Sequence, residues 1–261
     1  MKVYIQELYR FRELLWMWTI REIQVRYKQS ILGAAWAVVQ PIALMLAFTV
    51  VATFLRGQIQ TDGIAYPIFY YTALLPWTFF TNAITQSSTS MITNINLLIK
   101  TYFPREILPI AKVGVGFFDY LIAALVFIAM LFIYRVTITW TVLWVPVLLA
   151  VQIVLTLGLG FLSSSIIVLY RDVRFVVPLF LQILLFLTPI IYPAGLVPAH
   201  LRPFYLAVNP VAALVDGYRQ TILYGNSPGW PLLTAGLWAV LTFTIGYLLF
   251  KRLERIFADI I

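Results

Sequence analysis

The chain has 261 residues, 62% of them hydrophobic and only 11% charged, with a formal net charge of +8 and no cysteine. Because a soluble domain averages about 25% charged residues, this composition excludes an ordinary soluble protein, and the missing cysteines exclude a disulfide framework and a thiolate metal site. We predict an all-α integral membrane protein whose positive charge reflects the positive-inside bias and not nucleic-acid binding.

The first 30 residues predict a helix that lies in the plane of the membrane interface. Their stretch LYRFRELLWMWTIREIQVRYKQS repeats aromatic and aliphatic side chains at helical spacing, with cations mostly on another face, a pattern typical of interfacial helices. The residues assigned to this helix are Trp16, Trp18, Ile20, Arg21, Ile23 and Tyr27. The alternative is a soluble amphipathic helix packed on another subunit. Recurring charges and the lack of an uninterrupted apolar core argue against a signal peptide.

Six apolar stretches approach or exceed the roughly 20 residues that cross the hydrocarbon core of a bilayer. We therefore predict six membrane-spanning helices in a single domain, 1–261, with the interfacial segment 1–30 before them and a tail at 251–261 after them. The predicted spans are 31–55, 66–90, 107–134, 142–169, 176–192 and 231–250. The connection after the fifth span, 193–229, predicts two short amphipathic helices broken at Pro210.

The cations predict which side of the membrane each loop faces. If both termini and the loops after the second and fourth spans share one side, that side holds 14 of the 18 Lys and Arg residues. Cytoplasmic loops carry such an excess. We therefore predict that both termini lie in the cytoplasm, which an even number of spans requires.

A basic stretch, TNINLLIKTYFPREILPIAK at 93–112, interrupts the apolar sequence on the predicted cytoplasmic side. It predicts a short helix, because Asn94 or Asn96 can cap its start and Phe103, which precedes Pro104, is pushed out of the α region. Its apolar edge consists of Leu97, Leu98 and Tyr102. An apolar edge on a cytoplasmic helix favours a docking element, and the alternative is an ordinary solvated basic loop.

Ionisable side chains are too sparse for catalysis or ion-driven transport, and we predict no catalytic residue and no metal site. Asp119 is the one acid deep in a predicted span, with Lys112 two turns earlier on the same face, and a structural polar contact is favoured over a transport site. His200, the single histidine, is expected to be a surface group. Asp216 and Arg219 can pair at i, i+3 on a helix. No glycine is followed directly by lysine, which excludes a Walker ATP-binding loop.

Aromatic residues gather in the second predicted span. Most must serve packing or an interfacial belt, but aromatic faces also bind the C–H faces of sugar rings without requiring one stereochemistry. Both uses stay open, and the candidates for contact with a sugar chain are Tyr70, Tyr71, Trp77, Phe79 and Phe80.

Five stretches, in this order, resemble one family. They are REIQVRYKQSILGAAWAVVQP at 21–41, LLPWTFFTNAI at 74–84, NLLIKTYFPREILP at 96–109, YRDVRFVVP at 170–178 and TPIIYP at 188–193. Together they resemble the type-2 ABC exporter permeases that move lipid-linked polysaccharides, namely the O-antigen, capsule and teichoic acid exporters. The resemblance runs almost end to end and includes the closing RLERIFADII.

The resemblance implies a homodimeric, multi-pass pore in the cytoplasmic (inner) membrane of a bacterium, embedded in membrane lipids. It implies two copies of a separate ATPase subunit, which would bind the ATP and Mg. It places a coupling helix at 94–105, re-entrant external helices at 193–229 and a second cytoplasmic contact at Tyr170 to Arg174. The ATPase-coupling residues would be Asn96, Leu97, Leu98, Lys100, Tyr102, Phe103 and Arg105, and the second contact would be Arg171, Asp172 and Arg174.

On this resemblance, ATP binding by the partner would move the coupling helices and widen a path for a lipid carrier with its glycan. The chain itself would make and break no bond. The main alternative is a permease of the same architecture that exports a small hydrophobic drug or a lipid. An intramembrane transferase and a secondary transporter fit less well, because both need more carboxylates or histidines than this chain has.

Overall fold

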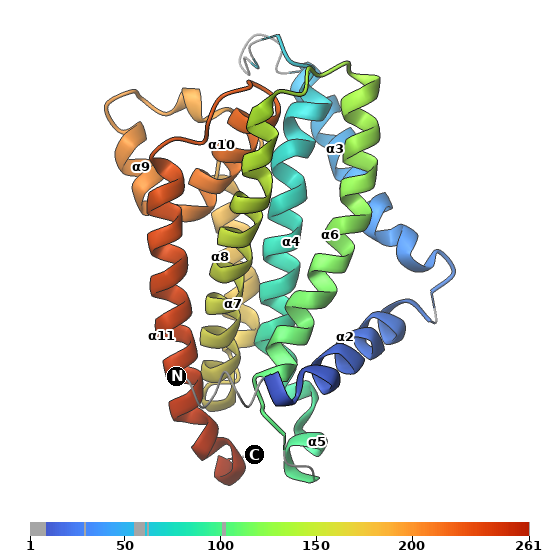
Figure 1. Ribbon diagram of the computed structural model, residues 1–261, viewed down its shortest axis with the longest axis vertical. Coiled ribbons are helices and arrows are strands. Elements are labelled where there is room, and N and C mark those ends of the chain that lie inside the picture. Colours follow the sequence, from blue (N-terminus) through green and yellow to red (C-terminus); the bar gives the residue numbers. More distant parts are fainter. Residues whose placement is uncertain (1–8, 29, 55–60, 62, 101–102, 261) are drawn as a thin grey trace.

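The computed structural model describes residues 9–28, 30–54, 61, 63–100 and 103–260, with side chains as far as Glu254. Within these ranges the chain forms helices and loops and no strand, which confirms the all-α prediction. The long helices run side by side as an elongated bundle (Figure 1).

Seven of the described helices have 15 or more residues and lie in the bundle or against its side. They are α2 (Arg12–Tyr27), α3 (Trp36–Phe54), α4 (Tyr66–Thr93), α6 (Ile107–Ile133), α7 (Val145–Leu169), α8 (Val173–Leu187) and α11 (Pro231–Ile260). The connecting elements are η1 (Gly33–Ala35), α5 (Ile95–Lys100), η2 (Trp140–Trp144), η3 (Ala194–Leu196), α9 (Arg202–Val208) and α10 (Pro210–Ile222).

Length and composition support four of the six predicted spans in the described residues. The four helical stretches that are long and apolar enough to cross a membrane are Gly33–Phe54, Ile107–Ile133, Trp140–Leu169 and Pro231–Glu254. The helix α4 has 28 residues but a polar second half. The helix α8 has 15 residues, fewer than the roughly 17 that a crossing takes at least.

The central helix of the bundle is α4. The helices α3, α6, α7, α8 and α10 all pack against it (Figure 1). This position explains how the most polar of the long inner helices is accommodated, because its neighbours separate much of its surface from the surroundings and backbone carbonyls accept from its hydroxyls. Thr72, for example, is buried and donates to the Ile68 carbonyl at 2.7 Å.

The closest helix contact joins α7 to α11 through two glycines. A Cβ added to Gly158 would lie 2.4 Å from the Phe243 nitrogen, and one added to Gly246 would lie 2.2 Å from the Gly158 carbonyl oxygen. Small residues let helix backbones approach in membrane proteins, where van der Waals contact replaces the hydrophobic effect as the driving force for association. Phe161 fills the adjacent space and meets the Phe250 ring at a centroid distance of 5.3 Å.

The connection between α8 and α11 forms two short helices, as predicted from 193–229. The first, α9, ends at Val208 and the second, α10, begins at Pro210. Asn209 caps α10, because its Oδ1 accepts from the backbone N–H groups of Val211 at 3.1 Å and Ala212 at 3.0 Å. Both helices lie at the end of the bundle opposite α5 (Figure 1).

A buried arginine holds this end together. Arg219 is 2% exposed, and its guanidinium donates to the backbone carbonyls of Phe69, Pro189, Tyr192 and Ile190, the last at 2.6 Å. It therefore ties α10 to α4 and to the turn after α8. The pairing of Arg219 with Asp216 that the sequence allows is not among the ion pairs of the described residues. The carbonyls occupy the guanidinium donors instead.

We expect the α7–α11 contact to tolerate no added side chain at Gly246. Gly246→Val should lower the stability of the purified protein by about 1–3 kcal/mol or more, because the obstructing atoms are backbone and cannot rotate away. Gly236→Val on the same helix is the matched control, since nothing lies within 4 Å of its added Cβ. Thermal unfolding in detergent measures both, and equal midpoints for the two variants would contradict the assignment.

Candidate functional site

The partly open face of α4 is polar between residues 78 and 90. From residue 78 to residue 90 every half-buried position of α4 carries a hydroxyl or an amide, and every other position is buried. We call these positions the polar stripe, which consists of Thr78, Thr81, Asn82, Thr85, Gln86 and Thr89. The spacing of the stripe follows the helical repeat, so its side chains lie on one side of the central helix.

The polar stripe keeps hydrogen-bonding capacity for a ligand. Thr81 donates to the Trp77 carbonyl at 3.0 Å and Thr78 to the Leu75 carbonyl at 3.0 Å. Each hydroxyl that bonds to its own helix still has lone pairs that can accept. Within the described part of the chain, the side-chain amides of Asn82 and Gln86 have no protein partner in a hydrogen bond. The stripe can therefore bind hydroxyl groups without offering a net charge.

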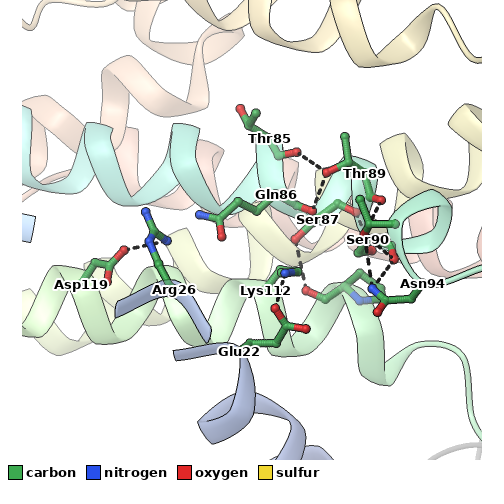
Figure 2. A network of polar contacts seen from close by, with 12 residues as sticks. Glu22, Arg26, Thr85, Gln86, Ser87, Thr89, Ser90, Asn94, Lys112 and Asp119 are labelled. Atoms are coloured by element: carbon green, nitrogen blue, oxygen red, sulfur yellow. Dashed lines mark hydrogen bonds and ion pairs between the residues drawn. The ribbon is translucent and has the colours of Figure 1, made fainter. Parts of the chain in front are cut away.

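Two ion pairs fasten α2 to α6 beside the polar stripe (Figure 2). Lys112 pairs with Glu22, and Asp119 pairs with Arg26 at 2.9 Å. The Tyr27 hydroxyl also donates to Asp119. Both ionisable residues of α6 that the sequence singled out thus have an oppositely charged partner on α2. Their partners come from α2, about 90 positions earlier, and Lys112 and Asp119 do not pair with each other.

The face of α2 that packs on α6 carries Thr19, Glu22, Arg26 and Tyr27. Thr19 lies against Gly114, where an added Cβ would come within 2.9 Å of the Thr19 Cγ2. Trp16 is 68% exposed, whereas Trp18 is half-buried and stacks under the Arg21 guanidinium at 4.4 Å. Tyr27, placed on the lipid face by its spacing, points inward to Asp119. Protein contact with the same chain thus occupies one side of this helix.

A small cavity, lined by polar and apolar side chains, adjoins the N-terminal part of the polar stripe. Its volume is about 60 Å³, and Arg26, Gln40, Thr78, Asn82 and Asp119 line it together with aromatic neighbours. Space of this size and polarity suits a few water molecules. The region thus combines uncharged donors and acceptors with a neutralised ion pair. It has no arrangement for acid–base chemistry, and no cluster of three metal-ligating side chains forms among the described residues.

The five aromatic candidates lie in the first and middle parts of α4, and all five are buried. They are Tyr70, Tyr71, Trp77, Phe79 and Phe80. Tyr71 stacks on Phe127 at a centroid distance of 5.9 Å, and Phe79 meets Tyr120 at 5.8 Å. In the single chain these rings contact protein, which is the packing role that the sequence left as one alternative. The half of α4 that stays open is the polar half.

The predicted short helix after α4 forms as α5, but its exposed apolar residue is not the expected one. Leu98 is 8% exposed and packs inside the chain's own cluster with Met91, Phe103 and Phe250. Ile99 is 63% exposed. Leu98 is therefore a core residue, which corrects its assignment to a docking edge.

The remaining coupling candidates spread over the surface and interior of this end. Asn96 and Lys100 are exposed and Leu97 is half-buried, while Tyr102 lies outside the described residues. Asn94 does not cap α5, because its amide donates back to the Ser90 carbonyl at 2.9 Å and closes α4. Asn96 lies within the helix.

Charged side chains connect the segment after α5 to the end of α11, a link that local sequence signals did not reveal. Glu106 is 1% exposed and accepts from Lys251 at 2.8 Å, and Lys251 also donates to Glu254 at 2.9 Å. Arg105 donates to the Glu254 carbonyl at 2.5 Å. Burial raises the pKa of the Glu106 carboxyl, and its bond to Lys251 opposes the rise. We call these four residues the α5–α11 lock. Arg105 and Glu106 lie between α5 and α6, and Lys251 and Glu254 lie in α11.

The proposed second contact lies in the turn between α7 and α8. Arg171, Asp172 and Arg174 are exposed there. Val173 between them packs with the cluster that holds Leu98, so the turn lies at the same end of the bundle as α5. The structure therefore brings both predicted contact regions to one surface.

Comparison with known proteins covers nearly the whole chain. Residues 13–223 match the family model for the ABC-2 type transporter. The chain is 28% identical over 253 residues to the O-antigen export system permease protein RfbA of Klebsiella pneumoniae, covering 95% of each chain. It is 29% identical over 221 residues to RfbA of Myxococcus xanthus, covering 84% of each. It is 24% identical over 251 residues to the polysialic acid transport protein KpsM of Escherichia coli, covering 90% of this chain and 92% of the relative.

We expect the Glu22–Lys112 contact to behave as one charge pair. Glu22→Lys and Lys112→Glu should each destabilise the protein, by about 1–3 kcal/mol, because each leaves two like charges facing one another in a partly buried site. The double variant restores opposite charges and should recover most of the loss. Thermal unfolding of the four proteins gives the coupling, and a double variant as unstable as the sum of the singles would contradict a direct pair.

Proposed function

The chain belongs to the ABC-2 type transporter family, and on this premise we propose that it is the transmembrane subunit of an ATP-driven exporter that moves a lipid-linked polysaccharide across the cytoplasmic membrane. The observation that carries the proposal is the nearly end-to-end likeness to permeases named for O-antigen and polysialic acid. The drug or lipid exporter of the same architecture is not favoured.

The polar stripe supports a hydrophilic cargo. A helix at the centre of an apolar bundle needs no open row of hydroxyls and amides to bind a hydrophobic drug. A polysaccharide presents many neutral hydroxyl groups, which the stripe can donate to and accept from without selecting a charge. We assign the polar stripe, in preference to the buried aromatic rings, as the surface along which the glycan passes.

The proposed topology has six spans, with α4 and α8 as the second and fifth. The end that carries α5, the α7–α8 turn and the end of α11 faces the cytoplasm together with both termini, since the Lys and Arg residues concentrate there. The helices α9 and α10 lie at the opposite, external end as re-entrant elements between the fifth and sixth spans. A bacterial inner membrane is the setting that the named relatives support.

Two further kinds of subunit complete the proposed exporter. Two copies of a cytoplasmic ATPase would bind ATP and Mg and dock on the α5 end, where Ile99 and Lys100 are exposed. A second copy of this chain would complete the pore. We place it against α8, because this short helix has one buried residue, Leu181, and an otherwise uncovered apolar surface.

The mechanism is mechanical and involves no covalent step in this chain. Closure of the ATPase dimer on ATP would displace α5, and the α5–α11 lock would pass this displacement to α11. Because α11 packs on α7 backbone to backbone, the two helices would move as one unit. The resulting shift would widen the path beside the polar stripe and let the lipid carrier cross with its glycan.

The test of the function is a strain that lacks this gene. We expect lipid-linked glycan to accumulate on the cytoplasmic side while surface glycan disappears, because export is the blocked step. Extracted lipids and surface polysaccharide measure the two pools. Unchanged glycan in both would remove the polysaccharide assignment.

The same strain tests the stripe when it carries variant copies of the gene. Thr85→Val with Gln86→Leu should lower surface glycan while membrane abundance stays normal, because shape is nearly kept and hydrogen bonding is lost. Thr244→Val, which removes an exposed hydroxyl from α11, is the matched control. Full export by the stripe variant would contradict the path.

Two neighbouring residues of α5 separate docking from folding. Ile99→Asp should leave abundance and thermal stability nearly unchanged, within about 0.5 kcal/mol for an exposed position, yet abolish export and uncouple ATP hydrolysis. Leu98→Asp should reduce abundance, because it buries an unpaired carboxylate. Membrane abundance, surface glycan and ATPase rate are measured together. Normal export by Ile99→Asp would remove α5 as the docking element.

A further inference from the structure

A large cavity lies at the end of the bundle opposite α5. Its volume is about 660 Å³, within the roughly 300–1,000 Å³ typical of small-molecule sites. Its walls come from the start of α4, from η3 and from α9, α10 and the segment that follows. The residues that matter for its chemistry are Phe69, Arg202, Asp216, Arg219, Gln220 and Asn226.

Arg219 contributes shape to this cavity and little ligand chemistry. Its guanidinium already donates to four backbone carbonyls, and it lies over the Phe69 ring at 3.7 Å from the centroid. The ring face of Phe69 is therefore covered by protein. Carbonyl oxygens take up the donors of Arg219, while its positive charge still acts on Asp216.

Arg202, in contrast, keeps an unused donor. Its Nη2 donates to the carbonyls of Gly195 at 3.1 Å and Val197 at 3.4 Å, which fixes the side chain. Its Nε is buried and has no partner in a hydrogen bond. The Nε is too buried for a ligand in the cavity to reach. The Nη1 makes no hydrogen bond with a described residue, so it keeps capacity for one more acceptor.

Asp216 supplies the complementary acceptor on the same cavity wall. Burial raises the pKa of its carboxyl. The charges of Arg219 and Arg202 and a hydrogen bond from the Gln220 amide oppose that rise, and the remaining carboxylate lone pairs can accept from a ligand. The neighbouring amides are linked to each other, since the Asn226 Nδ2 donates to the Gln220 Oε1 at 3.0 Å. The cavity thus presents a carboxylate, a guanidinium donor and two amides.

The balance of charge selects the class of ligand. Asp216 lies between the charges of two guanidiniums, Arg219 and Arg202, and of these only Arg202 keeps a spare donor. A phosphate or carboxylate that accepts from Arg202 would therefore also meet Asp216 as a like charge. A sugar hydroxyl can donate to Asp216 while an adjacent one accepts from Arg202. Apolar walls at Leu196 and Ala194 suit the C–H face of a sugar ring.

We propose that this cavity between η3, α9 and α10 binds one or two neutral sugar residues of the glycan as it leaves the bundle, through hydroxyl groups shared by Asp216 and Arg202. The proposal rests on the proposed function and adds a contact on the exit side. Binding there must be weak enough for the chain to move on, with a Kd on the order of 1 mM.

The test uses the full-length chain in lipid nanodiscs and oligosaccharides released from the strain's own surface glycan. Titration calorimetry or ligand-observed NMR measures binding. Asp216→Asn and Arg202→Gln should each weaken binding about tenfold, the loss expected for one hydrogen bond to a charged group. Arg135→Gln, which changes an exposed cation in the α6–α7 connection at the same end, should leave binding unchanged.

Thermal unfolding separates this role from a structural one. Asp216→Asn should keep the wild-type midpoint, whereas Arg219→Gln should lower it because buried carbonyls lose their donor. Inorganic phosphate at 10-fold excess over the oligosaccharide should not compete. Competition by phosphate, equal binding by wild type and Asp216→Asn, or no binding by the wild type would each overturn the proposal.

The result is distinguishable from failure of the exporter function itself. If the deletion strain loses surface glycan and Asp216→Asn binds like wild type, only the exit site is wrong. If the deletion strain keeps its surface glycan, the polysaccharide function fails whatever the cavity binds.

Discussion

The fold depends on one constraint: hydrocarbon offers no hydrogen bonds, so each polar group inside a membrane must find its partner in the protein. Arg219 shows the constraint at one end, where four backbone carbonyls accept from one buried guanidinium. The pairs of Lys112 with Glu22 and of Asp119 with Arg26 show it along α6. The position of the polar helix α4 at the centre follows from the same requirement.

The same constraint makes the remaining open polar surfaces informative. The polar stripe of α4 and the cavity at Arg202 and Asp216 keep donors and acceptors that the chain itself does not use. One lies inside the bundle and the other at its end opposite α5. The α5–α11 lock and the glycine contact of α11 with α7 join the segment after α5 to these two helices. This arrangement suits a neutral, hydroxyl-rich polymer as the cargo and a mechanical displacement as the driving input.

Local sequence patterns predicted where helices and breaks occur, but they did not predict which side of each helix is exposed. The break at Pro210 was predicted correctly, because proline geometry acts within a few residues. The short helix after α4 also forms, although neither Asn94 nor Asn96 caps it. The exposed residue of α5 was not predicted, because Leu98 and Ile99 are both apolar and only the burial of Leu98 in a cluster that includes Phe250 separates them. The inward orientation of Tyr27 was not predicted for a similar reason, because its partner Asp119 lies 92 positions away in the sequence.

The sequence by itself determined the class of this protein: an apolar, cysteine-free, positively charged helical chain whose motifs resemble polysaccharide exporter permeases. Composition depends only on which residues are present, and helical periodicity depends only on near neighbours in the sequence. Both can therefore be determined without a structure. Only the tertiary structure decided which side of each helix is open, which aromatic rings are core and which charges are neutralised. Those outcomes depend on partners about 90 to 150 positions apart, and no local pattern in the chain carries that information.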